Sequence, residues 1–475
     1  MSSPPNIIYI FSDEWRAQAT GYNQDPNCET PVLDSFARQS QQVTHAVSGC
    51  SVCCPYRASL LTGQYPLTHG VFINDVELNP DCHSIARAFG DQGYHTAWIG
   101  KWHVYGSPDG KNERRAKPVP RSHQMGFDEW MGFECTHNYL QSGYFHNENP
   151  TLQPWGDYDA FAQSRAAVDY MKDRAETENP FLLMLSWGPP HFPLNNAPEK
   201  YQQLYANRDI KLRENVPEPF RELAVSELRG YYAHIAALDH ALEIVLTGIQ
   251  DAGLAENTLV VFTSDHGDMR QSQGLATKCF PWDESIRVPF LLHDPRHPEH
   301  AGTSIPLLID APDIMPTLLG LCDFDIPESV EGKSYAQELS GIREPDPDDA
   351  AFLNMSAEFT EIQYNEMCAY RGIRTRRYTY VRNTEGPWLL YDNQTDPYQK
   401  NNLIEDPDAV ELQARMEHRL QQMLLDRKDA FLPSNTYLER AGLTHYRETQ
   451  CQPLQIWRDP WKSSSPQPVP NTPIA

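Results

Sequence analysis

The chain has 475 residues, of which 40% are hydrophobic and 22% charged, and its formal net charge is −25 at pH 7. This composition is typical of a globular protein, and the length allows about two to three domains. The negative charge argues against general binding to nucleic acids, and no apolar run approaches the roughly 20 residues that cross a bilayer. A local cluster of basic side chains and a metal ion can still bind an anionic substrate.

The N-terminal stretch reads MSSPPNIIYIF. A secretory signal would show a basic start, a longer apolar core and a small-residue cleavage site, and this stretch shows none of them. We therefore expect a cytoplasmic location for the sequence as written, or a periplasmic or secreted one if a signal was removed.

Apolar runs that end in polar residues recur along the chain. They cover residues 7–11, 95–99, 181–185 and 258–263, and they are followed by Asp13 and Glu14, Lys101 and His103, His191, and Asp265 and His266. Near-continuous apolar runs predict strands that are buried on both faces of a sheet. Because sites gather beyond the carboxyl ends of parallel strands, we expect these polar residues to meet.

Helices are predicted between these strands. Pro31 follows Thr30, which is the pattern of a helix start, and residues 223–252 carry apolar side chains at helical spacing. The alternation predicts an α/β fold with a mostly parallel sheet flanked by helices, and we assign residues 1–347 to this catalytic domain.

A smaller α+β subdomain is predicted for residues 348–440. Residues 368–382 and 388–391 favour antiparallel strands, and residues 408–427 favour an amphipathic helix. Residues 441–475 are predicted to form a C-terminal extension, and its end at 463–475 is rich in Pro and Ser.

The most specific pattern begins at Cys53 and reads CPYRASLLTG after it. It resembles C-x-P-x-R-A-S-L-L-T-G, the signature of the type I sulfatases, and Pro55 and Arg57 fix the register on Cys53 rather than Cys54. The resemblance implies that a formylglycine-generating maturation enzyme oxidises Cys53 to formylglycine. The hydrated aldehyde would then attack a sulfate ester through a covalent sulfo-enzyme intermediate, and Arg57 would hold the hydrate.

Two other interpretations of this cysteine stay open from the residues alone. Cys53 could be a buried thiol at a helix start, or it could form a C-x-x-C redox or zinc motif with Cys50. The redox alternative predicts a disulfide between Cys50 and Cys53, which is incompatible with formylglycine at Cys53.

The carboxylates after two of the predicted strands suit a hard divalent cation such as Ca²⁺ or Mg²⁺. The sulfatase resemblance carries metal binding onto Asp13, Asp265, His266 and the Cys53-derived hydrate. Glu14 stands where many relatives have a second Asp, so its place among the ligands is the open point. A single His among carboxylates favours calcium over zinc.

Three further segments are similar to sulfatase motifs. In Gly100-Lys-Trp-His103, the resemblance implies that Lys101 and His103 meet the formylglycine and the sulfate, with His103 assisting release. His191, in a P-H-x-P segment, and Lys278 would contact the sulfate and the leaving oxygen. A solvated lysine and a structural histidine are the alternatives for such residues taken singly.

The resemblance extends from residue 6 to about residue 426, and it implies the alkaline-phosphatase-like α/β fold. Basic residues at 111–121 and aromatic residues at 127–145 favour a sulfated saccharide as substrate, and a packed surface loop is the alternative. The rival activities are phosphonate monoester or phosphodiester hydrolysis, and arylsulfatase activity of unknown natural substrate. A sugar-binding protein without catalysis is the rival from another class. The oligomeric state is left open.

Overall fold

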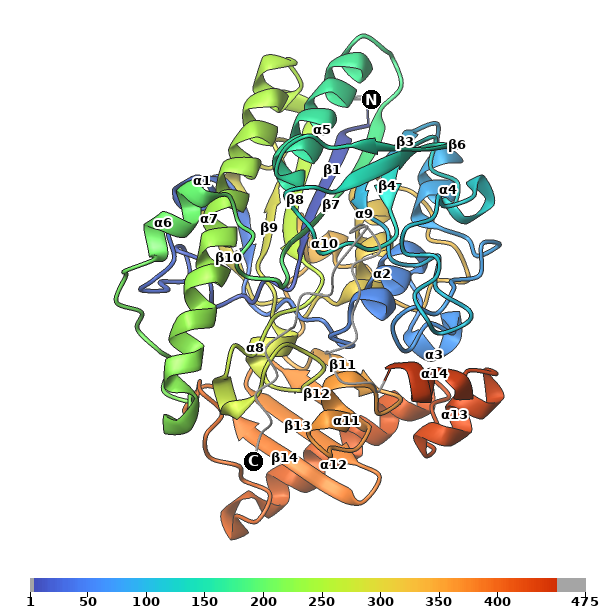
Figure 1. Ribbon diagram of the computed structural model, residues 1–475. Helices are drawn as coiled ribbons and strands as arrows, with labels where there is room; N and C mark the ends of the chain where they lie inside the picture. Colours follow the sequence, from blue (N-terminus) through green and yellow to red (C-terminus); the bar gives the residue numbers. More distant parts are fainter. Residues whose placement is uncertain (1–3, 451–475) are drawn as a thin grey trace.

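The structure is a computed structural model, and it describes residues 4–450, with side chains up to residue 447. A ten-stranded sheet forms its centre, with strand order β10-β2-β9-β8-β1-β7-β3-β4-β5-β6 (Figure 1). The strands are β1 (Asn6–Asp13), β2 (Gln41–Val43), β3 (His95–Lys101), β4 (Glu129–Phe133), β5 (Gly143–His146), β6 (Asn149–Pro154), β7 (Phe181–Pro190), β8 (Thr258–Ser264), β9 (Phe290–His293) and β10 (Ser304–Ile305).

The central strands β8, β1, β7, β3 and β4 run parallel, whereas β9, β5 and β6 join the sheet in antiparallel pairs. The four strands predicted from apolar runs are β1, β3, β7 and β8, so the predicted, mostly parallel sheet is confirmed. Parallel neighbours place their carboxyl ends at one edge, which brings the residues that follow them together.

Alternation along β1 builds two hydrophobic cores. Ile7, Tyr9 and Phe11 pack on one face of the sheet, and Ile8 and Ile10 pack on the other. Since successive side chains of a strand point to opposite faces, an unbroken apolar run fits only a strand that is covered on both sides.

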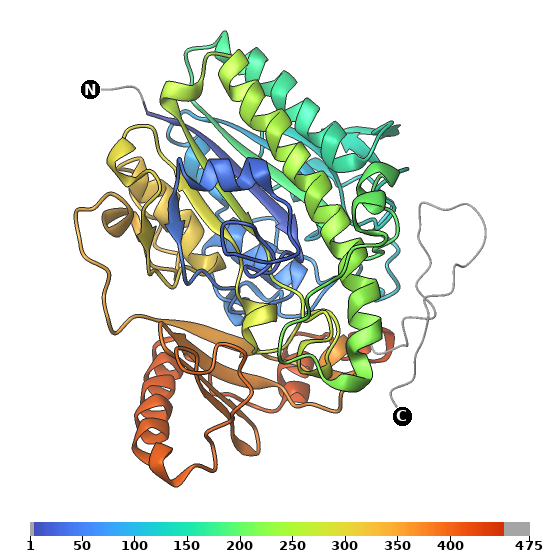
Figure 2. The same cartoon turned by 90° about the vertical axis from the view of Figure 1, so that its left-hand side faces the viewer.

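Helices cover both faces (Figures 1 and 2). One face carries α1 (Pro31–Ala37), α5 (Asp159–Ala175), α6 (Glu199–Tyr205) and α7 (Arg221–Asp251); the other carries α2 (Cys53–Thr62), α4 (Ile85–Gly90), α9 (Ala311–Leu321) and α10 (Ala336–Leu339). The short helices are α3 (Pro66–His69), α8 (Asp283–Ile286), α11 (Thr360–Tyr364), α13 (Ser434–Arg440) and α14 (Thr444–Gln450).

The predicted helix starts and ends agree with α1 and α7, but the start of α1 is held differently from the expectation. The Thr30 side chain makes no capping hydrogen bond to the first turn. Instead, the Asp239 carboxylate on α7 accepts hydrogen bonds from the backbone N–H groups of Val32 and Leu33, at 3.1 and 2.8 Å. A carboxylate at a helix N-terminus satisfies donors that the helix itself leaves unpaired, so α7 fixes the position of α1.

A four-stranded antiparallel sheet lies beside this domain, at the bottom of Figure 1, in the order β11-β12-β13-β14. Its elements are β11 (Ala350–Met355), β12 (Tyr370–Thr375), β13 (Tyr378–Asn383), β14 (Gly386–Asp392) and the helix α12 (Val410–Asp426). Phe352 and Ile373 pack against α12, whereas Leu353 and Val381 join a core of the larger domain. The sheet is therefore buried on both faces. The strands predicted at 368–382 and 388–391 and the helix predicted at 408–427 are present, while β11 was not predicted.

The region 104–154 adds β4, β5 and β6 to the sheet edge. Phe127, Trp130, Phe133 and Tyr139 are fully buried there. The expectation that the aromatic residues of this region offer a sugar-stacking surface is wrong for these four, because their rings are part of the core.

No helix in residues 4–450 is both long and apolar enough to cross a membrane. The predicted Pro- and Ser-rich end at 463–475 lies outside the described residues.

Candidate active site

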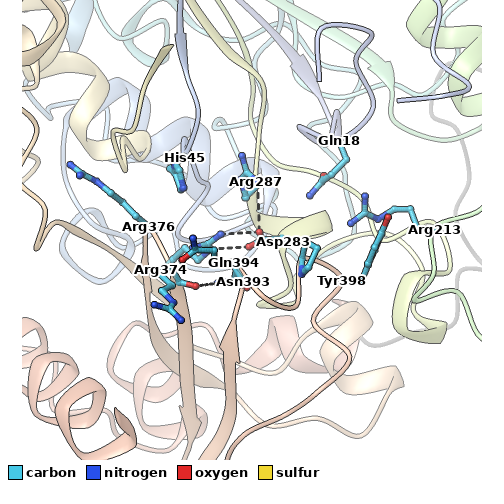
Figure 3. Close-up of a pocket in the computed structure, with 12 residues that line it drawn as sticks. Gln18, His45, Arg213, Asp283, Arg287, Arg374, Arg376, Asn393, Gln394 and Tyr398 are labelled. Carbon is cyan, nitrogen blue, oxygen red and sulfur yellow. Dashed lines mark hydrogen bonds and ion pairs between the residues drawn. The ribbon is translucent and has the colours of Figure 1, made fainter. Parts of the chain in front are cut away.

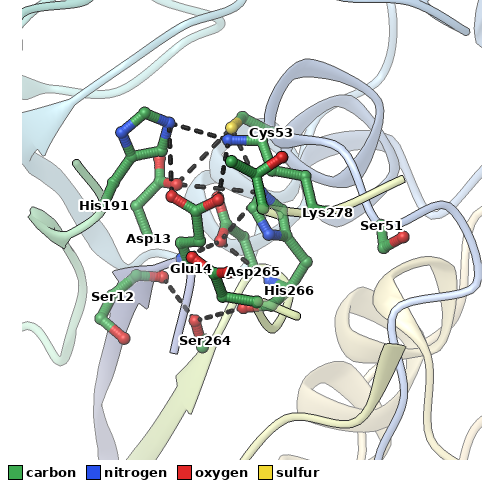
Figure 4. A network of polar contacts seen from close by, with 12 residues as sticks. Ser12, Asp13, Glu14, Ser51, Cys53, His191, Ser264, Asp265, His266 and Lys278 are labelled. Carbon is green, nitrogen blue, oxygen red and sulfur yellow. Dashed lines mark hydrogen bonds and ion pairs between the residues drawn. The ribbon is translucent and has the colours of Figure 1, made fainter. Parts of the chain in front are cut away.

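Four neighbouring parallel strands deliver most of the predicted site residues. Asp13 ends β1, Lys101 ends β3, His191 follows β7, and Asp265 and His266 follow β8. Cys53 is the first residue of α2. Figure 4 shows the side chains of Asp13, His191, Asp265, His266 and Cys53 pointing toward one another. The convergence expected at the carboxyl ends of the strands is therefore present.

A buried group of possible metal ligands occupies the centre. Ligand atoms of Asp13, Cys53, Asp265 and His266 all lie within 4.8 Å of one another, and Asp13, Glu14 and His191 form a second, overlapping group. Every carboxylate in these groups is fully buried. Such a concentration of unscreened negative charge is costly unless cations neutralise it.

Glu14 is held in an unusual backbone conformation, with a positive φ of 74°. Its backbone N–H donates to Asp265 Oδ1 at 3.0 Å, and the Tyr231 hydroxyl donates to its carbonyl oxygen at 2.9 Å. A positive φ costs a residue with a side chain on the order of 1 kcal/mol, and these two hydrogen bonds hold it. Neither Glu14 carboxylate oxygen accepts a hydrogen bond within residues 4–450. Buried carboxylate oxygens of this kind suit a cation, so the residues fit a divalent metal.

Arg57 links the carboxylates to the strands. Its Nη2 lies 3.3 Å from Asp13 Oδ2 and 3.4 Å from Asp265 Oδ2. Its Nη1 donates to the Lys101 carbonyl oxygen at 2.8 Å and to Ser186 Oγ at 2.7 Å. Every one of these partners is buried, so Arg57 neutralises charge and also fixes the geometry of the centre.

Two lysines complete the charge balance. Lys101 Nζ contacts Asp13 Oδ2, and Lys278 Nζ lies 3.2 Å from Glu14 Oε1 and 2.8 Å from His191 Nε2. His191 Nδ1 in turn donates to the Phe192 carbonyl oxygen at 2.9 Å. Because a carbonyl only accepts, this bond places the ring hydrogen on Nδ1 and leaves Nε2 to accept from Lys278.

The Cys53 thiol lies among these charges, with Sγ 3.2 Å from His266 Nε2 and 3.5 Å from Asp13 Oδ1. Burial and the Asp13 charge raise its pKa, but Lys278, Lys101 and His266 outweigh them and lower the pKa to about 6. The site therefore favours negative charge at the very position where the signature places the nucleophile.

Cys50 and Cys53 are both free thiols in the structure. Burial, followed by the Asp310 charge, raises the pKa of Cys50, in contrast to its neighbour Cys53. The disulfide that the redox interpretation predicts is absent from the described residues.

His103 is held by a partner that the sequence analysis did not name. Its Nε2 lies 3.6 Å from Asp75 Oδ1, and Arg115 Nη2 lies 2.7 Å from Asp75 Oδ2. Burial lowers the pKa of His103, but Cys135, Cys54 and Asp75 raise it well above its ordinary value. Arg115, part of the basic run 111–121 that was expected to meet an anionic group of the substrate, is buried against Asp75.

Three residues of the centre were not among the site residues predicted from the sequence. Ser186 binds Arg57, Asp75 holds His103, and His137 stacks on His191 with ring centroids 4.4 Å apart and an interplanar angle of 3°. Ser186 could have been suspected, because it follows an apolar run. Asp75 lies in a loop without a recognisable pattern.

Comparison with known proteins shows the family to which the chain belongs. The family model described as Sulfatase matches residues 5–324, and the model described as N-sulphoglucosamine sulphohydrolase, C-terminal, matches residues 272–426. The "Ulvan-active sulfatase" of Formosa agariphila is 41% identical over 438 residues, which cover 92% of this chain and 84% of the relative. The "Endo-4-O-sulfatase" of Bacteroides thetaiotaomicron is 32% identical and covers 86% of this chain and 90% of the relative.

A solved structure agrees with these sequences. The "putative sulfatase yidJ" of Bacteroides fragilis superposes with a TM-score of 0.82 at 27% identity. The match covers 92% of this chain and 98% of that protein. The fold is the alkaline-phosphatase-like α/β fold of this group. The chain belongs to the sulfatase family and is a sulfuric ester hydrolase.

Proposed function

We propose that this sulfatase removes a sulfate ester from a sulfated carbohydrate, with a formylglycine made from Cys53 as nucleophile and one calcium ion beside it. The observation that carries the proposal is the position of Cys53 Sγ, which lies at the N-terminus of α2 within the buried group formed with Asp13, Asp265 and His266. That position combines a reactive atom, metal-ligating oxygens and cationic side chains.

The donor set supports calcium. Asp13, Glu14 and Asp265 would supply carboxylate oxygens, and His266 Nε2 would supply one nitrogen. A bound divalent cation supplies positive charge to the sulfate oxygens, and a formylglycine hydrate supplies the attacking hydroxyl. The Cys53 thiol marks where the hydrate oxygens would stand.

The chain's own residues would act on either side of the sulfate. Arg57 and Lys101 fix Asp13, which keeps the ligand group in one arrangement. Lys278 is a buried ammonium that can donate a proton to the leaving alkoxide, and His191 orients it through the 2.8 Å contact. Asp75 and Arg115 would keep the His103 ring in place for the release step.

The relatives support a carbohydrate substrate, since their printed names refer to ulvan and to an endo-4-O-sulfatase. Three basic residues of the region 104–154 are exposed, namely Lys111, Lys117 and Arg121. Their side chains can meet a second anionic group of a saccharide. The saccharide itself is to be found by screening sulfated oligosaccharides.

The first experiment weighs the Cys53 peptide of protein purified from its native host, where a maturation enzyme would act. Oxidation of the thiol to the aldehyde lowers the peptide mass by about 18 Da, the change expected for the activated nucleophile. We expect that change at Cys53 and not at Cys50, which lies in the same peptide region. An unmodified thiol together with full sulfatase activity would contradict the proposal.

A second measurement separates the rival activity. The protein should hydrolyse a sulfate monoester much faster than a phosphonate monoester of the same alcohol. The variant Cys53→Ala should lose both activities, whereas Cys50→Ser should keep them, because Cys50 faces the core rather than the charged centre. Preference for the phosphonate ester would favour the rival.

A further inference from the structure

A second charged cavity lies apart from the catalytic centre, at the junction between the large domain and the four-stranded sheet (Figure 3). Its volume is about 500 Å³, and none of the metal-ligand or catalytic residues named above lines it. We call it the arginine pocket, because it is lined by Arg213, Arg287, Arg374, Arg376 and Arg377. Asp283 is the one acidic residue in its wall. Such a cationic wall is unexpected in a chain with a net charge of −25.

Three of the arginines have carboxylate partners. Arg374 binds Asp283 through Nε and Nη2, both at 2.9 Å. Arg213 Nε lies 2.8 Å from Glu284 Oε1, and Arg377 reaches Asp392 at 2.9 and 2.6 Å. The pair of Arg374 and Asp283 joins the two domains, whereas the other two pairs each lie within one domain, and all three are structural.

The other two arginines, Arg287 and Arg376, have no carboxylate partner of their own among residues 4–447. Arg287 Nη1 lies 3.8 Å from Asp283 Oδ2, a carboxylate that Arg374 already binds at shorter distance, and its Nη2 donates to the Thr44 carbonyl oxygen. Arg376 donates to the Asp346 carbonyl oxygen at 2.7 Å and makes no ion pair with any residue from 4 to 447. The Nε atoms of both are buried without a hydrogen-bond partner in the same part of the chain. Two guanidinium groups thus have donors to spare.

The pKa shifts of His45 and Arg287 agree with an excess of positive charge in the arginine pocket. Burial, with Arg287 and Arg374, lowers the pKa of His45 in the pocket wall to about 4. Burial also lowers the pKa of Arg287 itself, and Arg374 and Arg213 act in the same direction against Asp283. Positive potential in the pocket is therefore only partly neutralised by the protein.

The rest of the wall is neutral and can form hydrogen bonds. Gln18, Asn393 and Gln394 offer amides, and Tyr398 offers a ring that Arg213 overlies at 4.8 Å. Planar guanidinium groups match the paired oxygens of sulfate and carboxylate groups, and amides match hydroxyls.

We propose that the arginine pocket is an oxyanion-binding site, separate from the catalytic centre, that takes one sulfate or carboxylate group through Arg287 and Arg376. The group can come from free inorganic sulfate, the product of the reaction, or from an anionic residue of a saccharide chain. The site does not depend on the proposed nucleophile or metal, because none of its residues belongs to that centre.

The test uses the full chain carrying Lys278→Ala, which removes one cation of the catalytic centre. Inorganic sulfate is titrated calorimetrically at constant ionic strength, with chloride as the balancing anion. Adding Arg376→Gln should weaken sulfate binding by about tenfold to a hundredfold, the effect of one lost charge-assisted hydrogen-bonding group. Adding Arg165→Gln, which removes an exposed arginine outside the pocket, should leave the affinity unchanged.

Two further measurements keep the test independent of folding. Arg376→Gln in the otherwise unchanged protein should retain turnover of a small aryl sulfate and an unchanged melting temperature. Arg376→Lys should bind sulfate with intermediate affinity, because it keeps the charge and loses the fork. Equal sulfate affinity in Arg376→Gln and its parent, or no saturable sulfate binding in the parent, overturns the proposal.

A uronate oligosaccharide without sulfate esters separates the two sources. Tighter, Arg376-dependent binding of this oligosaccharide than of sulfate supports a second saccharide subsite. Arg376-dependent binding of sulfate alone supports a site that responds to free product. Arg376-independent binding of both probes overturns the site.

Discussion

Lys278 and His191 meet in the buried centre, with Nζ 2.8 Å from Nε2. The His191 ring is fixed from the other side by the bond from Nδ1 to the Phe192 carbonyl oxygen and by stacking on His137. Lys278 therefore has one defined direction in which to present its protons, toward the region of Cys53 and Glu14.

This relationship predicts how activity depends on the leaving group. Lys278→Ala should lower kcat on the order of 100- to 10,000-fold for an alkyl sulfate, as expected when a proton donor is lost. The loss should be much smaller for an aryl sulfate with an acidic phenol, because that leaving group needs no proton. Steady-state rates across a series of phenyl sulfates measure this. His191→Ala should show the same trend more weakly, and equal losses for good and poor leaving groups would contradict the assignment.

Arg57 should matter for both activity and stability. Arg57→Ala leaves Asp13 and Asp265 buried next to each other without their shared cation, and breaking a buried ion pair costs about 3–5 kcal/mol. We expect loss of turnover and a lower free energy of unfolding by urea titration. Arg57→Lys should recover part of the stability, since it restores the charge. A variant Arg57→Ala as stable as the parent would mean that the two carboxylates are neutralised by other groups.

Metal removal tests the ligand group. Chelation should abolish turnover and lower the melting temperature, because binding to the folded state alone adds stability by mass action. Calcium should restore both. The variant Asp13→Asn should need more calcium for the same activity, while an exposed acidic variant such as Glu178→Gln should not. Turnover that survives complete chelation would argue against a metal role.

His69 makes the stability depend on pH. It is the last residue of α3 and contacts α2. The Val71 N–H donates to its Nδ1 at 3.1 Å, and its Nε2 lies 3.0 Å from Ser59 Oγ. Burial lowers its pKa to about 3, while an unfolded histidine titrates near about 6.5. The unfolded state thus binds a proton first as the pH falls from about 6.5 to about 3. The contribution of His69 to the free energy of unfolding is fully present above this window. It falls within the window by at most about 1.4 kcal/mol for each pH unit.

The measurement is urea unfolding across that pH range. His69→Gln should show a shallower loss of stability on acidification than the parent. The exposed His418→Gln should follow the parent. Identical slopes for the parent and His69→Gln would show that His69 becomes protonated in the folded protein.

The pair of Arg374 and Asp283 joins the two domains. Both side chains are buried, and the contact is bidentate at 2.9 Å. Asp283→Ala should lower the free energy of unfolding by about 3–5 kcal/mol, because Arg374 would be left without its partner. Arg165→Ala, in an exposed pair, should change it by about 1 kcal/mol or less. A double-mutant cycle over Arg374 and Asp283 measures the coupling, and a coupling near zero would contradict the structural role.

The sequence predicted those parts of the site that depend on local order. Asp13, Lys101, His191, Asp265 and His266 follow apolar runs, and parallel strands place their ends at one edge whatever lies between them. The Cys53 signature is continuous and lies at a helix start, so its register could be fixed without a structure. These features depend on residues that are close together in the sequence, and the hydrophobic patterns that predict strands and helices are local in the same way.

The tertiary structure decided which side chains from distant segments pair with each other or line the same pocket. Asp75 with His103, Ser186 with Arg57, and Arg287 with Arg376 in one pocket come from segments with no shared pattern. The same holds for the aromatic residues of 127–139, which the composition suggested for sugar contact and the fold uses as core. The physical reason is that burial and ion pairing depend on distances between segments far apart in the sequence. The sequence alone therefore determined the family, the order of the motifs along the chain and the residue proposed as nucleophile, and only the packed chain determined the partners that orient them.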